Sequence, residues 1–296
     1  MRVFITGATG FIGSAIVTDL IQNGHRVLAL ARSDDAAASL GVAGAEVHRG
    51  DLKDLASLRA GAALSDGVIH AAFDHDFSRF AENCDVDRQA IEAIGQALEG
   101  SDRPLIVTSG LPLAPGRLAT ENDVPPQGSG GSPRASEQAA LALLGRGVRV
   151  SVVRMSQAHD QTRHGLASYL ITLAREKGIS AYIGSGLNRW AAVHRQDTGS
   201  VYRLALETNV AGARYHAVAE EGLSVGEMAE VIGRHLNLPV VSLSPAEAPA
   251  HFGWLAFPAG MDAPASSALT RQRLRWKPMQ NAGFMADLES STAWQA

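Results

Sequence analysis

The chain has 296 residues, enough for one large α/β domain or for a nucleotide-binding domain with a smaller second lobe. Its hydrophobic content is 46% and its formal net charge is −4, a balance that provides no large basic field to attract nucleic acid. No apolar run approaches the roughly 18 residues of a membrane span, and the single cysteine, Cys84, excludes an internal disulfide, so we expect a cytoplasmic protein that acts apart from membranes.

Apolar runs of strand length alternate with stretches of helical period through the first half of the chain. We expect strands at 3–5, 26–31, 46–48, 67–71, 105–107 and 148–153, and helices at 12–21, 36–40, 52–58, 85–98 and 133–144. The alternation predicts an α/β fold with a doubly wound parallel Rossmann sheet, covered by helices on both faces. The segment 114–132, rich in Pro, Gly and Ser, is predicted to be a long loop.

The regular alternation of strand-length and helix-length segments ends at the start of the second half of the chain. Helices are predicted at 166–177, 197–207 and 224–236, the last with Ser224 and Glu227 as a capping box. We expect a nucleotide-binding domain at 1–158 with 192–220, and a smaller C-terminal substrate lobe at 159–191 with 221–296.

A glycine-rich segment follows the first strand directly and opens the first helix, which is the context that a dinucleotide site requires. Gly7 permits the tight turn, Gly10 lets backbone amides approach a pyrophosphate, and Gly13 allows close packing of helix on strand. We therefore expect a dinucleotide over this turn, with contacts from Thr6, Gly7, Thr9, Gly10, Phe11, Ile12 and Gly13.

The end of the second strand indicates which dinucleotide binds. In NAD-selective sites an acidic residue at this point accepts a hydrogen bond from the adenosine 2′-hydroxyl. Here the strand ends in Ala31-Arg32-Ser33, and Arg32 can pair with a 2′-phosphate to which Ser33 donates. The sequence therefore favours NADP over NAD, unless Arg32 is simply a solvated surface arginine.

With these residues in view, the chain resembles, over almost its whole length, the extended short-chain dehydrogenase/reductase superfamily, which is related to the sugar-nucleotide epimerases and dehydratases. The resemblance is carried by four motifs: the glycine-rich segment, Gly50-Asp51-Leu52, His70-Ala71-Ala72, and Leu274-Arg275-Trp276-Lys277-Pro278. It implies that Asp51 and Leu52 contact the adenine, and that Ala71, Ala72 and Phe73 pass beside its ribose and the pyrophosphate.

The family's Tyr-x-x-x-Lys pair, which transfers a proton and holds the nicotinamide ribose, is missing, because no tyrosine of this chain precedes a lysine by four. Arg134 falls at the corresponding segment, and we expect it to hold a ribose hydroxyl or stabilise an oxyanion. Thr108 and Ser109 end the fifth strand, where the family's serine lies, with Thr108 expected near the cofactor and Ser109 as a catalytic candidate. The chain thus resembles a divergent, atypical subgroup.

A histidine is the natural replacement for the missing acid, since its pKa lies near the operating range. His75 follows the fourth strand, and His159 and His164 lie in the loop after the sixth. Each is a catalytic candidate or, alternatively, a polar loop histidine. No cysteine or carboxylate completes a metal set with them at a recognisable spacing, so we expect no metal.

The substrate lobe offers a candidate pocket. Residues 188–190 and 193–197, with Arg134 and Arg163, suit a small anionic or carbonyl-rich molecule, unless these arginines pair with surface carboxylates. Phe252, Trp254 and Phe257 either close this pocket or belong to the core.

Taken together, these residues predict an NADP-dependent oxidoreductase acting on a small carbonyl/alcohol substrate. Two alternatives stay open: an epimerase, isomerase or dehydratase that uses bound NAD(P), and a noncatalytic NADP-binding sensor. The sequence also leaves a homodimer open.

Overall fold

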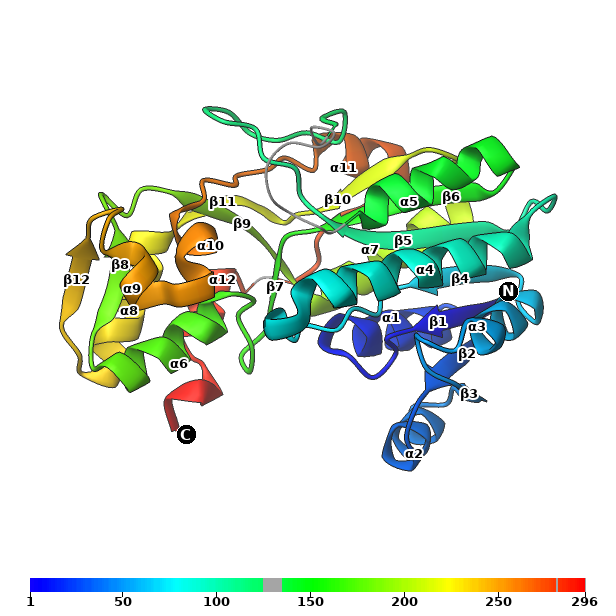
Figure 1. The fold of residues 1–296 in the computed structure, drawn as a ribbon, viewed down its shortest axis with the longest axis horizontal. Helices are drawn as coiled ribbons and strands as arrows, with labels where there is room; N and C mark the ends of the chain where they lie inside the picture. The colour runs from blue at the N-terminus through cyan, green and yellow to red at the C-terminus, as the bar shows by residue number, and fades with distance from the viewer. Residues whose placement is uncertain (125–134, 281, 296) are drawn as a thin grey trace.

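The computed structural model describes residues 1–124, 135–280 and 282–295. Its centre is a seven-stranded sheet with the order β10-β6-β5-β4-β1-β2-β3, in which every neighbouring pair is parallel (Figure 1). The strands are β1 (Arg2–Thr6), β2 (Arg26–Ala31), β3 (Glu46–Arg49), β4 (Gly67–His70), β5 (Pro104–Gly110), β6 (Arg149–Met155) and β10 (Arg214–Ala217). The predicted fold class is confirmed.

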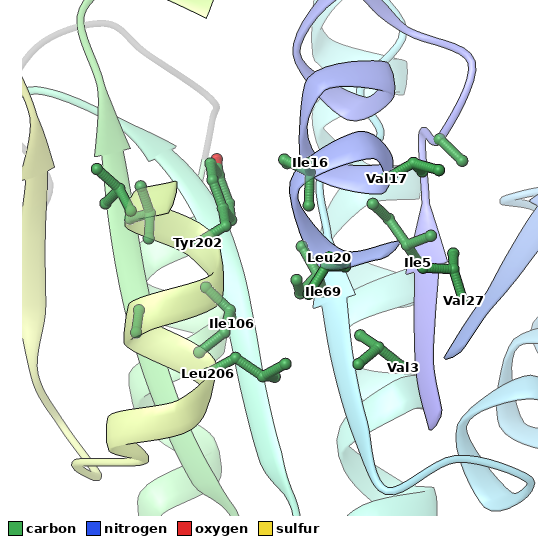
Figure 2. Packing of buried hydrophobic residues seen from close by; sticks show 14 of the residues in the cluster. Val3, Ile5, Ile16, Val17, Leu20, Val27, Ile69, Ile106, Tyr202 and Leu206 are labelled. Carbon is green, nitrogen blue, oxygen red and sulfur yellow. The ribbon is translucent and has the colours of Figure 1, made fainter. Parts of the chain in front are cut away.

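Helices cover both faces of this sheet because alternate residues of each strand point to opposite sides. On one face, Val3 and Ile5 share a core with α1 (Phe11–Gln22) and α7 (Arg195–Thr208). Figure 2 shows Ile16, Val17 and Leu20 of α1 and Tyr202 and Leu206 of α7 on this face.

On the other face, Phe4 packs with α3 (Leu55–Ala63), α4 (Phe80–Leu98) and α5 (Ser136–Ala142). The short helix α2 (Asp34–Val42) connects β2 to β3, and the 3-10 turns η1 (Phe77–Arg79) and η2 (Leu143–Arg146) flank α4 and α5.

A second core lies at the end of the molecule that carries the C-terminus (Figure 1). It contains a three-stranded sheet, β11-β9-β7, and a two-stranded sheet, β12-β8. The strands are β7 (Gln157–His159), β8 (Ser180–Ile183), β9 (Arg189–His194), β11 (Glu220–Ser224) and β12 (Val240–Leu243). The helices here are α6 (Ala167–Lys177), α8 (Val225–Leu236), α9 (Ala248–Phe252), η3 (Gly253–Leu255), α10 (Ala256–Gly260), α12 (Phe284–Glu289) and η4 (Thr292–Gln295).

The chain returns from the second core to the first at several points. After β9 it forms α7 and then β10, which adds to the edge of the large sheet. Later, α11 (Ala268–Leu274) packs against β10 and α7, and buried Trp276 donates from Nε1 to Ser200 Oγ of α7 at 2.9 Å. The boundary residues expected for the two parts stay a prediction.

The predicted N-terminus of α8 is confirmed, since Ser224 Oγ accepts a hydrogen bond from the backbone N–H of Glu227 at 3.2 Å. Several boundaries differ from expectation, including those of α3, which covers Leu55–Ala63 where 52–58 was expected. α4 begins at Phe80, five residues before the expected start at Asp85, and β4 ends at His70. The short strands of the second core, β7 to β9, β11 and β12, were not predicted, because runs of three to six residues there carry little periodic signal.

Candidate cofactor and substrate site

The glycine-rich turn is a tight loop between β1 and α1. Gly7 has a φ of +77°, a left-handed conformation that L side chains rarely adopt, and a Cβ there would lie 2.7 Å from the backbone nitrogen of Ala72. A Cβ on Gly13 would lie 1.9 Å from the carbonyl oxygen of Gly7. These two glycines are therefore required by the protein's own packing.

Gly10 differs from the other two glycines. It is exposed, its φ of −70° is open to any residue, and a Cβ there would meet only the Gly7 carbonyl oxygen, at 3.1 Å. The protein itself thus leaves the space above Gly10 open, at the N-terminus of a helix of 12 residues. This open space beside free backbone amides fits the pyrophosphate of a dinucleotide.

Beneath the turn runs a chain of buried hydrogen bonds. Thr6 Oγ1 lies 2.9 Å from His70 Nδ1, His70 Nε2 lies 3.0 Å from Asp87 Oδ1, and Ser136 Oγ donates to Asp87 Oδ2 at 2.5 Å. Because a carboxylate accepts, the His70 proton lies on Nε2 and Nδ1 accepts from Thr6. Thr6 Oγ1 in turn accepts from the backbone N–H of Ala72 at 3.4 Å. This series of hydrogen bonds connects the glycine-rich turn to the start of α5.

This polar chain was missed by sequence reasoning, although a signal was present. Asp87 occupies the buried stripe of α4 together with Cys84, Ile91 and Ile94. A carboxylate at such a position requires a buried partner. The structure also uses the side chain of Thr6 internally, so that any contact of Thr6 with a cofactor is left to its backbone.

The end of β2 carries Arg32 and Ser33, both exposed. Arg32 has no hydrogen bond or ion pair with the described part of the chain, whereas Ser33 Oγ caps α2 by accepting from the backbone N–H of Ala36 at 3.2 Å. A second cation was missed: Arg49, at the end of β3, donates to the Ser33 carbonyl oxygen at 2.7 Å and pairs with Asp34. Arg49 therefore pairs with Asp34, one of the two carboxylates in the first turn of α2.

The other predicted cofactor contacts gather at the same carboxyl edge. Asp51 and Leu52 follow β3 half-buried, and Asp51 Oδ1 accepts from the backbone N–H of Lys53 at 2.9 Å. Ala71 and Ala72 lie against Gly7, and the Phe73 ring lies 5.2 Å from that of His75. These residues are in the right place for a dinucleotide, and their contacts with one stay a prediction.

Thr108 and Ser109 lie at the end of β5, two strands from β1. Thr108 Oγ1 donates to the His70 carbonyl oxygen at 2.9 Å, and its oxygen lies 2.8 Å from the hydroxyl oxygen of Tyr202. Ser109 is half-buried, and its hydroxyl makes no hydrogen bond with the described residues. Ser109 therefore stays a catalytic candidate, while Arg134 lies outside the described residues.

A cavity of about 190 Å³ opens at Gly110, the residue after Ser109, where β5 and β6 end and the second core begins. Its wall is formed by Gly110, Leu111, Met155, Ser156, Gln157, Trp190, Ala191, Met261 and Ala263. Ligands of open parallel sheets bind outside the carboxyl ends of the strands. The cavity is therefore the candidate substrate site, and sequence reasoning identified only Trp190 of its wall.

The three candidate histidines differ in burial. His75 is exposed, in the loop after β4. His159 is buried, and its Nδ1 lies 2.8 Å from Asp287 Oδ2, but burial outweighs this partner and lowers the pKa of His159 to about 4. Burial also lowers the pKa of His164. Neutral, buried rings at 159 and 164 are poorly suited to deliver a proton directly to substrate, so His75 is the better placed of the three.

The arginines expected to form an anionic pocket have other contacts. Arg189 donates to both carboxylate oxygens of Asp262, and Arg195 lies 3.4 Å from Asp160. The guanidinium groups of Arg163 and Arg195 lie over the Phe11 ring, 5.7 and 5.1 Å from its centroid. None of them lines the cavity.

The aromatic residues are also distributed differently from expectation. Phe252 is buried in the second core, whereas Trp254 and Phe257 are 45% and 72% exposed, and none of the three lines the cavity. Across the described residues there is no group of three or more His, Cys, Asp or Glu that could hold a metal ion. None of the described helices combines the length and the apolar character that crossing a membrane requires.

A buried ionic cluster fixes the far edge of the sheet. Arg154, fully buried, donates to both carboxylate oxygens of Glu137 at 2.7 and 2.8 Å, and its Nη1 lies 3.2 Å from His216 Nε2. His216 Nδ1 lies 2.8 Å from the Ser266 carbonyl oxygen, so Nδ1 carries the proton. Burial lowers the pKa of His216 to about 4, which keeps the ring neutral beside Arg154.

Comparison with known proteins agrees with this geometry. Residues 3–94 match the family described as the NAD dependent epimerase/dehydratase family. An uncharacterized protein of Schizosaccharomyces pombe is 47% identical over 294 residues, which cover 98% of this chain and 99% of that protein. A sterol-4-alpha-carboxylate 3-dehydrogenase, decarboxylating, of Dictyostelium discoideum is 29% identical over 223 residues, covering 70% of this chain and 67% of that protein.

Solved structures share the fold. The crystal structure of DesIV, a dTDP-glucose 4,6-dehydratase from Streptomyces venezuelae with NAD and TYD bound, superposes with a TM-score of 0.77 over 99% of this chain and 96% of that one, at 20% identity. The glycine-rich turn, the parallel sheet and these similarities agree. Residues 3–94 therefore match the NAD dependent epimerase/dehydratase family, and the chain as a whole shares its fold with the solved dehydratase.

Proposed function

We propose that this protein is an NADP(H)-dependent oxidoreductase acting on the carbonyl/alcohol pair of a small molecule. The observation that carries the proposal is the open space over Gly10 together with an exposed, unpaired Arg32 at the end of β2, among the described residues. A nearby carboxylate, Asp34, is already paired with Arg49. A 2′-phosphate could therefore pair with the Arg32 guanidinium, which no described residue engages.

The residues present fit the cofactor. The backbone of Gly7 to Gly13 would hold the pyrophosphate, and Arg32 would bind the 2′-phosphate. The adenosine would lie at the edge of the sheet formed by Asp51 and Ala71 to Phe73. When bound, NADPH would supply the hydride for reduction of a carbonyl carbon, and an acid of the protein would supply the proton that the carbonyl oxygen takes. The sterol dehydrogenase among the relatives supports an oxidoreductase.

We assign the proton transfer to His75 and the polarisation of the carbonyl to Ser109. His75 is the exposed histidine among the three candidates, and its loop follows β4, the strand beside β5. The Ser109 hydroxyl is not engaged by the described residues, so it can donate to a substrate oxygen.

The cofactor choice is tested with Arg32→Ala, and Arg49→Ala serves as the matched control. A charge-assisted contact of about 1.5 to 3 kcal/mol corresponds to roughly tenfold to a hundredfold in affinity. Calorimetry should show NADP(H) binding more tightly than NAD(H) in the wild type, with most of the preference lost in Arg32→Ala.

Arg49→Ala should lose less, because Arg49 is already occupied by Asp34 and by the Ser33 carbonyl oxygen. Equal affinities of the wild type for the two cofactors would refute the NADP assignment. Tight NADPH binding without turnover of any aldehyde, ketone or keto acid would instead favour a noncatalytic sensor, and cofactor that stays bound through purification would favour an epimerase or dehydratase.

A further inference from the structure

The cavity at the ends of β5 and β6 has an apolar wall. Its larger side chains are Leu111, Met155, Trp190 and Met261, and no ionisable residue is among the described residues that line it. Two arginines are adjacent in sequence to wall residues, and both are paired: Arg189 with Asp262 and Arg154 with Glu137. A charged group placed in this cavity would therefore lose its hydration without gaining a described partner of opposite charge.

The polar groups of the wall are largely satisfied within the protein. Trp190 Nε1 donates to the Pro258 carbonyl oxygen at 3.2 Å, and Ser156 Oγ donates to that of Ala217 at 2.6 Å. Among the described residues, the Gln157 amide makes a hydrogen bond only through its oxygen. Its Oε1 accepts a hydrogen bond from the backbone N–H of Leu166 at 2.8 Å.

That hydrogen bond fixes the orientation of the Gln157 amide, because a backbone N–H requires an oxygen as its partner. The side chain is also held against Gly165, where a Cβ would lie 2.4 Å from Gln157 Oε1. Nε2 makes no hydrogen bond with the residues that the structure describes. Gln157 thus brings an oriented donor to the cavity wall.

We infer that this cavity binds a compact, uncharged and largely apolar carbonyl compound, whose oxygen accepts a hydrogen bond from Nε2 of Gln157. The inference rests on the proposed function, since it names the substrate class of the same site. The size agrees: an apolar cavity of about 150 Å³ is enough for benzene, and this one measures about 190 Å³. A ring or branched chain bearing one carbonyl matches this volume, whereas a nucleotide-sugar is larger than it.

Binding is tested first with the protein saturated with NADP⁺, where no turnover occurs. The probes are acetophenone, its carboxylated analogue phenylglyoxylate, and UDP-glucose, each titrated by calorimetry. We expect acetophenone to bind, and phenylglyoxylate to bind at least about a hundredfold more weakly, because its carboxylate would be buried without a partner. A wild type that prefers phenylglyoxylate or UDP-glucose, or that binds no acetophenone, overturns the inference.

Two kinds of variant locate the ligand. Ala263→Leu and Leu111→Phe add volume to the wall, and each should weaken acetophenone binding about tenfold or more without changing NADP⁺ affinity. Ala60→Leu is the control, because it makes the same substitution as Ala263→Leu at an exposed position of α3. If both wall variants fold and bind acetophenone as the wild type does, the ligand lies elsewhere and the inference is wrong.

Gln157→Glu tests the hydrogen bond itself. A glutamate oxygen can still accept the Leu166 N–H, so the melting temperature should hold, but the donor is lost. Infrared spectra of ¹³C-labelled acetophenone should show a lowered carbonyl stretch in the wild type and a smaller shift in Gln157→Glu, where a hydrogen bond from Ser109 would remain. An unchanged shift would remove Gln157 from the site.

Failure of the proposed function is recognised separately. All acetophenone titrations are repeated without cofactor, and NADP(H) binding is measured by itself. Absent NADP(H) binding refutes the oxidoreductase proposal, while the titrations still decide whether the cavity takes an uncharged carbonyl compound.

Discussion

Gly10→Val separates the space for the cofactor from the packing of the turn. At Gly10 a Cβ meets only the Gly7 carbonyl oxygen, at 3.1 Å, so the protein can accept it with a shift of a few tenths of an ångström. The branched side chain then stands in the open space above the turn. We expect NADPH affinity to fall by a hundredfold or more, about 2.7 kcal/mol, while the melting temperature changes by less than about 2 °C.

Gly13→Ala is the contrasting variant. Its Cβ would lie 1.9 Å from the Gly7 carbonyl oxygen, and ordinary contact begins near 3.4 Å, so helix and turn would have to separate by about 1.5 Å. Overpacking of this kind costs about 1 to 3 kcal/mol or more, which for a chain of this size lowers the melting temperature by roughly 2 to 10 °C. Differential scanning calorimetry and NADPH titration of both variants provide the test. Wild-type NADPH affinity in Gly10→Val, or an unchanged melting temperature in Gly13→Ala, would refute the assignment of these two roles.

Two further predictions concern histidines. Burial lowers the pKa of His159 and His216 from 6.5 to about 4, so the unfolded chain binds more protons between these values. The full free energy of unfolding is present above about pH 6.5, and it decreases as the pH falls from there to about 4, by up to about 3 kcal/mol for each ring. Melting temperatures at pH 7.5 and 5 should show the decrease. The reasoning is contradicted if the double variant His159→Gln/His216→Gln loses as much melting temperature between these pH values as the wild type does. His75→Gln should lower kcat by about a hundredfold and shift the pH profile of the rate without changing the melting temperature. Unaltered kinetics with the first carbonyl substrate found would exclude His75 as the acid.

Most elements of the first core were predictable because their signals are local, but the edge strand β10 was not predicted. A strand buried on both faces is a continuous apolar run, and a glycine-rich segment between strand and helix has few other uses. Gly7 and Gly13 show the packing role predicted for them, while the role of Gly10 depends on a ligand and stays a prediction.

The candidate substrate site was not predictable to the same degree, because it is built from residues far apart in the sequence. Leu111, Gln157, Trp190 and Met261 come together only when the second core closes against the ends of β5 and β6. The arginines that suggested an anionic pocket could be assigned partners only in three dimensions, as Arg189 with Asp262 shows. Burial, which separates His75 from His159 and His164, is likewise a property of the tertiary structure.

The repeated return of the chain to the first core limits how the two cores can move. The covalent connections at β6 to β7 and β9 to α7, together with the α11 segment and the anchored Trp276, join the same two bodies. If one core rotated relative to the other, a movement that relaxed one of these connections would strain the others. Two domains joined by a single linker, in contrast, can rotate about one hinge. Entry of a ligand at the ends of β5 and β6 should therefore require local shifts of side chains and loops, and the two parts should unfold together in a single calorimetric transition.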